Sequence, residues 1–234
     1  MFKRGNTKNT VRILIAVLIS ILPTNGLRCL AYRLLFGYDI RNAQLGFGAV
    51  IAVEKARLHG CRIGKMNRLI GPMTISIGKN AVIGPFNEFD CGGWTLDQRY
   101  SDSGYKRYLE IGEGVVVSAR HHFDIAGALV IGSQTWIAGR GSQFWTHGAG
   151  VKNRDIHIGK NCYIASAVRF APGAVVNDHC LVGIGSVVVG AIKETHALIG
   201  GVPAKVLKRS YDWKALIDED ASSPNRILLM SDAA

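Results

Sequence analysis

A strict six-residue period in residues 158–188 constrains the fold of this chain more than any other feature. Read in sixes, the segment is IGKNCY, IASAVR, FAPGAV, VNDHCL and VGIGSV, followed by one more valine. Neither an α-helix, with a period near 3.6, nor a lone strand, with a period of about 2, explains this spacing. The period is carried by one aliphatic or aromatic residue per unit: Ile158, Ile164, Phe170, Val176, Val182 and Val188.

A unit of six residues is too short to bury its own apolar side chain, so such units must stack. The pattern predicts a parallel β-helix, in which three short strands and their corners form one coil and successive coils share a core. Small residues at the second position suit a corner that passes close to its neighbours. The second position is small in four units, at Gly159, Ala165, Ala171 and Gly183, and the fifth-position residues are Cys162, Val168, Ala174, Cys180 and Ser186.

The same rhythm extends toward the N-terminus in groups of three, each group corresponding to one coil. Two long excursions interrupt it, residues 90–110 with Trp94 and several tyrosines, and residues 144–157 with Trp145 and His147. Long insertions in a rigid repeat array usually lie on one face and carry function. The expected inward positions are Leu45, Ile51, Arg57, Ile63 and Leu69, then Ile77, Ile83 and Phe89, then Ile111, Val117 and Phe123, and finally Ile131, Ile137 and Gln143.

The length of 234 residues and the 48% hydrophobic content favour one domain with short appendages. We expect an N-terminal helical segment in residues 1–44, a β-helix domain in residues 45–209 and a C-terminal helix or tail in residues 210–234. The five cysteines have no metal-binding C-x-x-C spacing, and three of them occupy small slots of the repeat. This predicts free thiols in a reducing compartment rather than disulfides.

The formal net charge of +11 is unevenly placed, since the first 41 residues carry seven Lys or Arg and one acidic residue, Asp39. An anionic partner near this end and a solvated basic tail both fit. The apolar run 11–22 follows Lys3, Arg4 and Lys8 and is too short to span a bilayer. A second helix after Pro23, ending near Gly37, is indicated by Leu27, Leu30, Leu34 and Leu35.

These two helices would either pack as a lid on the first coil or lie as a hairpin on a membrane surface, and the sequence leaves both open. An export signal would need a small-residue cleavage site after the run, but Arg28 and Arg33 stand in that region. We therefore expect a cytoplasmic protein that could sit peripherally on the inner face of the membrane.

After Val188 the repeats close with GGVPAKVLKR, residues 200–209. Repeats and ending together resemble the acetyl-CoA-dependent hexapeptide-repeat acyltransferases, and among them the sugar O-acetyltransferases of polysaccharide biosynthesis and lipid-carrier pathways. The resemblance covers roughly residues 45–209. It implies a left-handed coil, a homotrimer with active sites between subunits, acetyl-CoA as co-substrate, a sugar or lipid-linked sugar as acceptor, and neither a metal nor a nucleic-acid partner.

Acyl transfer from a thioester to a hydroxyl needs a base that works near neutral pH, for which imidazole is suited. His147, in QFWTHGAG, matches the family's catalytic histidine in the loop that leaves the third strand of a coil. The resemblance implies that His147 is the general base of a direct transfer. It also places coenzyme contacts, with the two lysines at the adenosine end, on Ser166, Ile184, Gly185, Lys205 and Lys208.

Acceptor contacts are expected from the excursions and from the coil before them. Ser118 falls where some sugar acetyltransferases place an asparagine that contacts the acceptor. Stacking would bring His121 close to the coil that carries His147, and Trp145 lies two residues before that histidine. The three form the expected acceptor pocket.

Three alternatives remain beside O-acetylation of a sugar. The acceptor could be the amine of an amino sugar, which the resemblance does not separate from a hydroxyl. The repeats could serve as a non-catalytic binding scaffold, although neither the closing motif nor a loop histidine is needed for stacking. A β-helix carbonic anhydrase would collect three imidazoles on zinc, but Lys152 stands where a second ligand, five residues after His147, would be expected.

Overall fold

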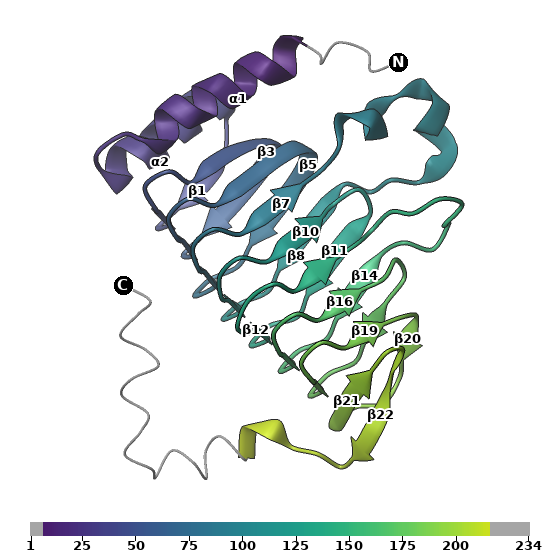
Figure 1. The fold of residues 1–234 in the computed structure, drawn as a ribbon. Coiled ribbons are helices and arrows are strands. Elements are labelled where there is room, and N and C mark those ends of the chain that lie inside the picture. The colour runs from purple at the N-terminus through teal and green to yellow at the C-terminus, as the bar shows by residue number, and fades with distance from the viewer. Residues whose placement is uncertain (1–6, 216–234) are drawn as a thin grey trace.

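The computed structural model describes residues 7–215 and confirms the predicted all-β core, a left-handed parallel β-helix (Figure 1). Two helices, α1 (Thr7–Ser20) and α2 (Asn25–Phe36), lie across its N-terminal end. Two 3-10 helices, η1 (Gly93–Leu96) and η2 (Gln98–Ser103), belong to the first excursion. The predicted tail beyond residue 215 lies outside the described residues.

Each coil has three faces, because a 13-stranded sheet bends around one corner and a nine-stranded sheet closes the prism. The long strands β3 (Val50–His59) and β5 (Arg68–Ile77) cross that corner, and β1 (Asp39–Arg41) pairs with β3. Face 1 continues from β5 through β7 (Glu88–Asp90), β10 (His122–Asp124), β13 (Gln143–Phe144), β16 (Arg169–Phe170) and β19 (Val187–Val188).

Faces 2 and 3 complete the coil. Face 2 runs from β5 through β8 (Tyr108–Ile111), β11 (Ala128–Ile131), β14 (Ile156–Ile158), β17 (Val175–Val176) and β20 (Ala191–Ile192). Face 3 contains β2 (Gln44–Leu45), β4 (Arg62–Ile63), β6 (Val82–Ile83), β9 (Val116–Val117), β12 (Trp136–Ile137), β15 (Tyr163–Ile164), β18 (Leu181–Val182), β21 (Ala197–Gly201) and β22 (Ala204–Arg209).

The inward positions of residues 158–188 are buried as predicted, but two positions further upstream are wrong. Gln143 is half-exposed, and its neighbour Phe144 points inward, with its ring centroid 4.6 Å from that of Phe123 and 4.8 Å from that of Phe170. The corner before it takes an extra residue. Arg57 is exposed and Leu58 is buried instead, because β3 carries a bulge between Val53 and Lys55 against β5.

The corner between faces 3 and 1 is lined by a ladder of buried polar side chains. The Asn67 carboxamide oxygen accepts from the Asn87 N–H at 2.8 Å, and the Asn87 oxygen accepts from the His121 N–H at 2.9 Å. His121 Nδ1 then accepts from the Ser142 N–H at 3.1 Å. Burial lowers the pKa of His121 to about 4, so the imidazole is neutral and serves this ladder.

The two N-terminal helices form where the leucine spacing predicts them. Thr24 caps α2 by accepting from the Leu27 N–H, and Gly37 ends it in the left-handed conformation with φ +67°. Ala16, Cys29 and Tyr32 are buried against the first coil. The helices therefore act as a lid, which one of the two sequence interpretations predicted.

This lid also satisfies the open edge of the first coil. The Tyr32 hydroxyl accepts from the Ile51 N–H at 3.0 Å and lies 3.1 Å from the Ala49 carbonyl oxygen, and Tyr38 accepts from the Val53 N–H at 2.9 Å. An exposed strand edge would otherwise pair with other chains. A terminal cap of this kind is what a stacked-repeat protein requires.

Replacing Tyr32 by Phe should therefore destabilise the protein by about 1–3 kcal/mol, since a buried N–H loses its partner. The free energy of unfolding can be followed by urea titration. Tyr163→Phe is the matched control, because the half-buried Tyr163 hydroxyl makes no hydrogen bond to another residue of the described range 7–215. Equal losses in the two variants would contradict the capping role of Tyr32.

Candidate functional site

Both excursions leave the β-helix at the same corner, between faces 1 and 2. The first connects β7 to β8 and the second connects β13 to β14. They contact each other: the Arg154 guanidinium lies 4.0 Å above the Tyr105 ring, and Lys106 forms an ion pair with Asp155. Residues 49 positions apart in the chain are thus brought into contact and form one wall, on one side of the β-helix as the sequence predicts.

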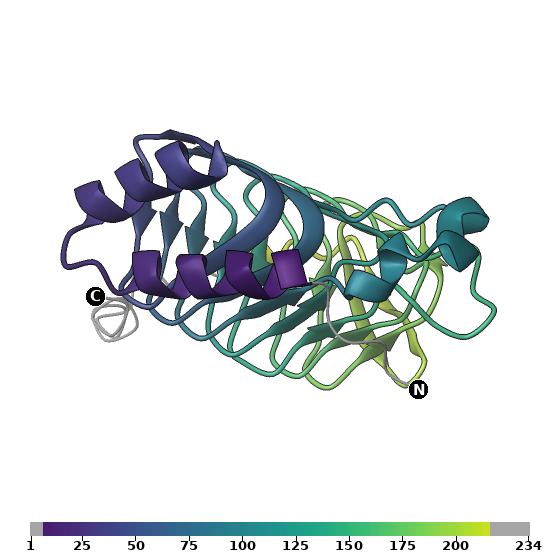
Figure 2. The same cartoon turned by 90° about the horizontal axis from the view of Figure 1, so that it is seen from above.

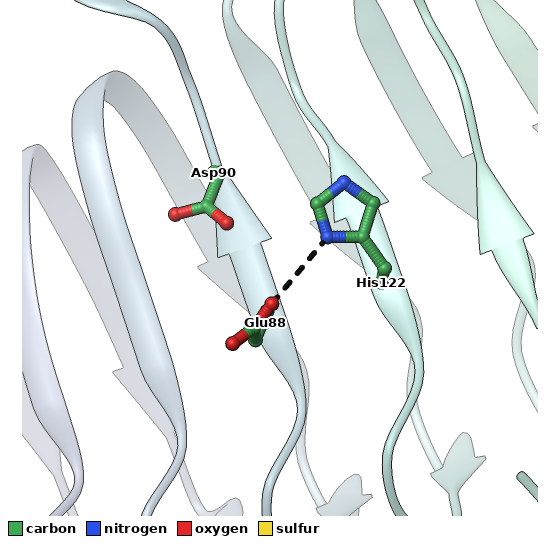
Figure 3. Close-up of side chains that lie close together, drawn as sticks. All are labelled: Glu88, Asp90 and His122. Atoms are coloured by element: carbon green, nitrogen blue, oxygen red, sulfur yellow. Dashed lines mark ion pairs between the residues drawn. The ribbon is translucent and has the colours of Figure 1, made fainter. Parts of the chain in front are cut away.

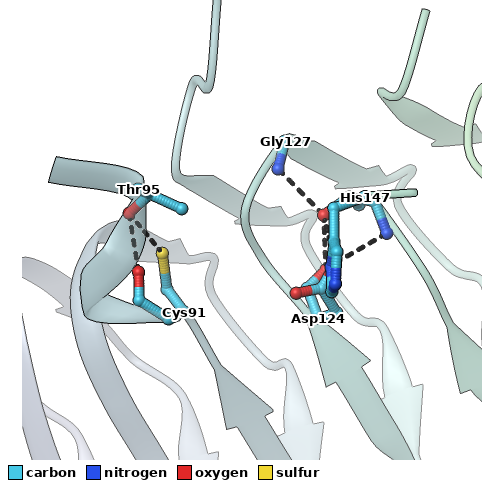
Figure 4. Close-up of polar contacts among 7 residues, drawn as sticks. Cys91, Thr95, Asp124, Gly127 and His147 are labelled. Atoms are coloured by element: carbon cyan, nitrogen blue, oxygen red, sulfur yellow. Dashed lines mark hydrogen bonds and ion pairs between the residues drawn. The ribbon is translucent and has the colours of Figure 1, made fainter. Parts of the chain in front are cut away.

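His147 stands at the base of this wall, where it is paired with a buried carboxylate (Figure 4). Its Nδ1 lies 2.8 Å from Oδ2 of Asp124, which ends β10 one coil earlier. The Asp124 side chain is 8% exposed, whereas that of His147 is 39% exposed. The pair therefore has a protected end and an accessible end.

The buried carboxylate is held in place by the residue before the histidine. Asp124 Oδ2 accepts from the Thr146 N–H at 2.8 Å, and the Thr146 hydroxyl lies 2.8 Å from the same oxygen. That hydroxyl accepts in turn from the Gly127 N–H at 2.8 Å. These contacts fix the position of the Asp124 carboxylate beside His147.

A carboxylate can only accept, so Nδ1 of His147 carries the proton and donates it to Asp124. Nε2 then holds a free lone pair on the accessible side of the ring. This is the tautomer that a general base requires.

Beside the imidazole lies a hollow of about 420 Å³ lined by residues of both excursions. The Trp94 ring contacts the His147 ring edge to face, with centroids 5.3 Å apart, and lies 5.0 Å from the Tyr105 ring. The hollow is lined by Trp94, Tyr100, Tyr105, His147, Gly148, Ala149 and Gly150. Aromatic side chains around a base can bind a ring compound that has an apolar face.

Cys91 lies in the same region, at the start of the first excursion (Figure 4). Its Sγ is 3.7 Å from the Thr95 hydroxyl, and burial raises the pKa of the thiol to about 11. A thiol that stays protonated near neutral pH is a weak nucleophile. The arrangement therefore favours a base over a covalent cysteine intermediate.

Of the three expected acceptor residues, the structure brings only Trp145 next to His147, with ring centroids 6.5 Å apart. Ser118 lies at the corner between faces 3 and 1, where its hydroxyl accepts from the Trp136 indole N–H at 3.2 Å. His121 belongs to the buried ladder of that corner and is 1% exposed. Within one chain only Trp145 therefore lies beside His147, and the acceptor roles of all three residues stay predictions.

The expected coenzyme residues of the turns do come together, but on a different edge from His147. Ser166 follows β15 and Ile184 follows β18, so both lie at the corner between faces 3 and 1. The Gly185 N–H donates to the Ser166 carbonyl oxygen at 3.0 Å, and Gly185 has a φ of +70°. Face 1 separates this edge from His147 within one chain.

The two lysines of the closing motif lie on β22, the last strand of face 3. Lys205 pairs with Gly200 and Lys208 with Leu198, and an irregularity in the pairing lies between these positions. Paired residues point to the same side of a sheet. Because Leu198 points away from the core while Ile199 points into it, the bulge places both lysines on the outer side.

One group of side chains in the described residues could hold a cation, namely Glu88, Asp90 and His122 on face 1 (Figure 3). Their ligand atoms lie within 4.8 Å of one another, and His122 Nδ1 is 3.7 Å from Oε2 of Glu88. Burial raises the pKa of Asp90. The His122 ring also contacts Trp145, at 4.8 Å, so this group borders the acceptor side of His147.

Sequence reasoning missed Asp124, the partner that fixes the tautomer of His147. The available signal was an acidic residue at the end of an inward-facing strand, directly after Phe123 and one coil before the histidine. The aromatic residues of the first excursion were noticed as a group. Their convergence on His147 depends on the path of the excursion, which has no repeat pattern.

No protein-family model matches this chain, and no curated protein matches it at significant similarity. The solved structures similar to it include the polySia-specific acetyltransferase NeuO, with 17% identity over 75% of this chain and 82% of that one and a TM-score of 0.48. A hexapeptide-repeat acetyltransferase from Vibrio cholerae has 17% identity over 88% and 92% of the two chains and a TM-score of 0.47. A galactoside acetyltransferase in complex with coenzyme A has 16% identity over 94% and 88%, with a TM-score of 0.41. The fold of this chain is established by its own strand pairing.

Proposed function

We propose that the protein transfers an acetyl group from acetyl-CoA to a hydroxyl of a sugar or glycolipid precursor, with His147 as general base. The observation that carries this proposal is the Asp124–His147 pair at the edge of an aromatic hollow. The repeats and the closing motif GGVPAKVLKR support the coenzyme. Several of the similar solved structures are named as acetyltransferases, three of them with acetyl-CoA or CoA bound.

In the proposed reaction, Nε2 of His147 takes the proton of the acceptor hydroxyl while its oxygen attacks the thioester carbonyl carbon. The carbon–sulfur bond then breaks, and the imidazolium returns the proton to the leaving thiolate. Asp124 stabilises the imidazolium in between and keeps its orientation. A backbone N–H near the coil corner would stabilise the oxyanion.

A sugar is the proposed acceptor class because the hollow combines aromatic faces with a base. A pyranose ring has an apolar C–H face that can lie on Trp94 or Tyr105 while its hydroxyls point to Nε2. Trp145 extends this surface on the face 1 side. An amino sugar fits the same surface, so N-acetylation is the second candidate. An acceptor from polysaccharide biosynthesis, free or lipid-linked, is consistent with both.

We further propose that the active unit is a homotrimer with sites between subunits. Within one chain, face 1 separates His147 from the edge that carries Ser166, Ile184 and Gly185. Packing that edge of one subunit against the His147 corner of the next would bring thioester and base together. We propose that the protein is located in the cytoplasm. Its attachment to a membrane surface would depend on the exposed side of the N-terminal helices.

The most direct test offers the purified protein acetyl-CoA with nucleotide sugars, free sugars, amino sugars and lipid-linked sugars, and follows thiol release. An accepted sugar should give acetylated product in equal amount to the thiol. Because no step of the proposed reaction uses a metal, adding EDTA should leave the rate unchanged. No acceptor-dependent thiol release with any of these classes would overturn the proposal and favour a binding scaffold.

Lys205 and Lys208 are proposed to contact the 3′-phosphate of the coenzyme, which dephospho-CoA lacks. Changing both to Ala should raise KM for acetyl-CoA but not for acetyl-dephospho-CoA, with kcat nearly intact, since a uniform contact affects only binding. Added salt should imitate the change in the parent protein. The double variant Lys55→Ala, Lys193→Ala, which removes two exposed cations elsewhere on the described surface, is the charge-matched control. A double variant that keeps the parental preference would assign the phosphate to other residues.

A further inference from the structure

The outer surface of the N-terminal lid is apolar over both helices. The helices α1 and α2 lie across the end of the prism (Figures 1 and 2), and their side chains that do not pack on the first coil are exposed. We call them the lid face. Its exposed members are Val11, Leu14, Ile15, Val17, Leu18, Ile21, Leu27, Leu30, Leu34 and Leu35. Monomeric soluble proteins rarely leave such a contiguous apolar surface without a partner.

The arginines that the structure describes on the two helices, Arg12, Arg28 and Arg33, turn toward the β-helix side of the lid. A guanidinium N–H of Arg12 donates to the Val53 carbonyl oxygen, and the Arg12 Cζ lies 4.7 Å above the Phe36 ring. The Arg28 Nε donates to the Leu45 carbonyl oxygen at 3.0 Å, and the Arg33 Nε donates to the Ile40 carbonyl oxygen at 2.8 Å. The described arginines thus bind the first coil and the chain that leads into it, which leaves the lid face aliphatic.

Charge at this end of the chain points to the partner. No Asp or Glu occurs before Asp39. Lys3 and Arg4 precede α1 in the sequence, and Lys8 is the second residue of α1. Basic residues beside an apolar helix face are attracted to anionic lipid, at about 1 kcal/mol each. Protein interfaces, in contrast, are enriched in aromatic residues, Met and Arg, none of which the lid face presents.

We propose that the lid face docks on an anionic lipid surface, with α1 and α2 lying in the plane of the interface. Helices of 14 and 12 residues suit this position, and within residues 7–215 none has the length and hydropathy of a transmembrane span. The β-helix would then stand on the membrane by its N-terminal end. His147 lies four strand steps from β3, along β5, β7, β10 and β13, or about 19 Å.

The test is flotation of the full chain with phosphatidylcholine vesicles, with and without phosphatidylglycerol. We expect binding to the anionic vesicles that weakens with added salt. The triple variant Leu18→Gln, Leu34→Gln, Leu35→Gln removes the three most exposed leucines of the lid face and keeps good helix formers. Its partition coefficient should fall at least about 100-fold. Leu207→Gln, which changes an equally exposed leucine on the last strand, should bind like the parent.

A parent protein that does not float with anionic vesicles, or a triple variant that floats like the parent, would overturn the proposal. Light scattering without lipid measures the molar mass and tests the alternative that the lid face binds a second copy of this chain. If the triple substitution lowers the molar mass and the parent does not bind lipid, the lid face joins copies of this chain instead. Circular dichroism checks that the variant is folded. Flotation needs no enzymatic readout, so its outcome is independent of the proposed acetyl transfer.

Discussion

Replacing His147 by Ala is expected to lower turnover by about two to four orders of magnitude, the usual contribution of a general base. The physical reason is that no other described side chain presents a free imidazole nitrogen to the aromatic hollow. Thiol release from acetyl-CoA in the presence of an accepted sugar measures the effect. Binding of the coenzyme, followed by calorimetry, should be unchanged because His147 acts on the acceptor.

The matched control for this loss is His157→Ala. His157 lies on the outer side of β14 on face 2, beyond the second excursion, and its loss should leave turnover near the parental value. A His147→Ala protein that keeps near-normal turnover would show that the base is elsewhere, and the proposed mechanism would fail with it.

The second large effect is expected from Asp124→Asn, at about two to four orders of magnitude in kcat. An Asn at this position can present its amide N–H to Nδ1, which moves the proton of the imidazole to Nε2 and removes the lone pair that accepts from the acceptor. KM for acetyl-CoA should barely change. The loss in kcat without a loss in coenzyme affinity separates this role from a general weakening of the fold.

Glu110→Gln is the control for Asp124→Asn, since it makes the same chemical change on the exposed side of face 2. It should leave kcat unchanged. A thermal unfolding scan of the Asp124 variant shows whether the buried site still folds. A folded Asp124→Asn protein with parental kcat would mean that the carboxylate only packs against His147.

The sequence predicted the coil well where the period is unbroken and poorly where a corner changes length. Residues 158–188 have corners of equal length, so every inward side chain could be assigned. The corner before Phe144 holds one residue more, which moved the expected inward position to Gln143. Counting apolar residues cannot detect this, because Phe144 and Gln143 are neighbours and both fit a strand.

The same one-residue error explains why Asp124 was missed. With Phe144 inward, Phe123 pairs with Phe144, and the end of β10 comes to lie beside the start of the second excursion. The grouping of Ser166 with Ile184 was easier to foresee, because the two are one 18-residue coil apart. Their separation from His147 by a whole face could not be read from spacing, since it depends on which corner each excursion leaves.

The contacts between the two excursions limit how the acceptor specificity could be redesigned. The coil supplies Asp124, while the excursions supply the aromatic surface that chooses the acceptor. Because Arg154 stacks on Tyr105 and Lys106 pairs with Asp155, each excursion helps to position the other. A change of acceptor by loop grafting would therefore have to replace residues 92–107 and 148–155 together. The strands of the β-helix, Asp124 and His147 would stay unchanged.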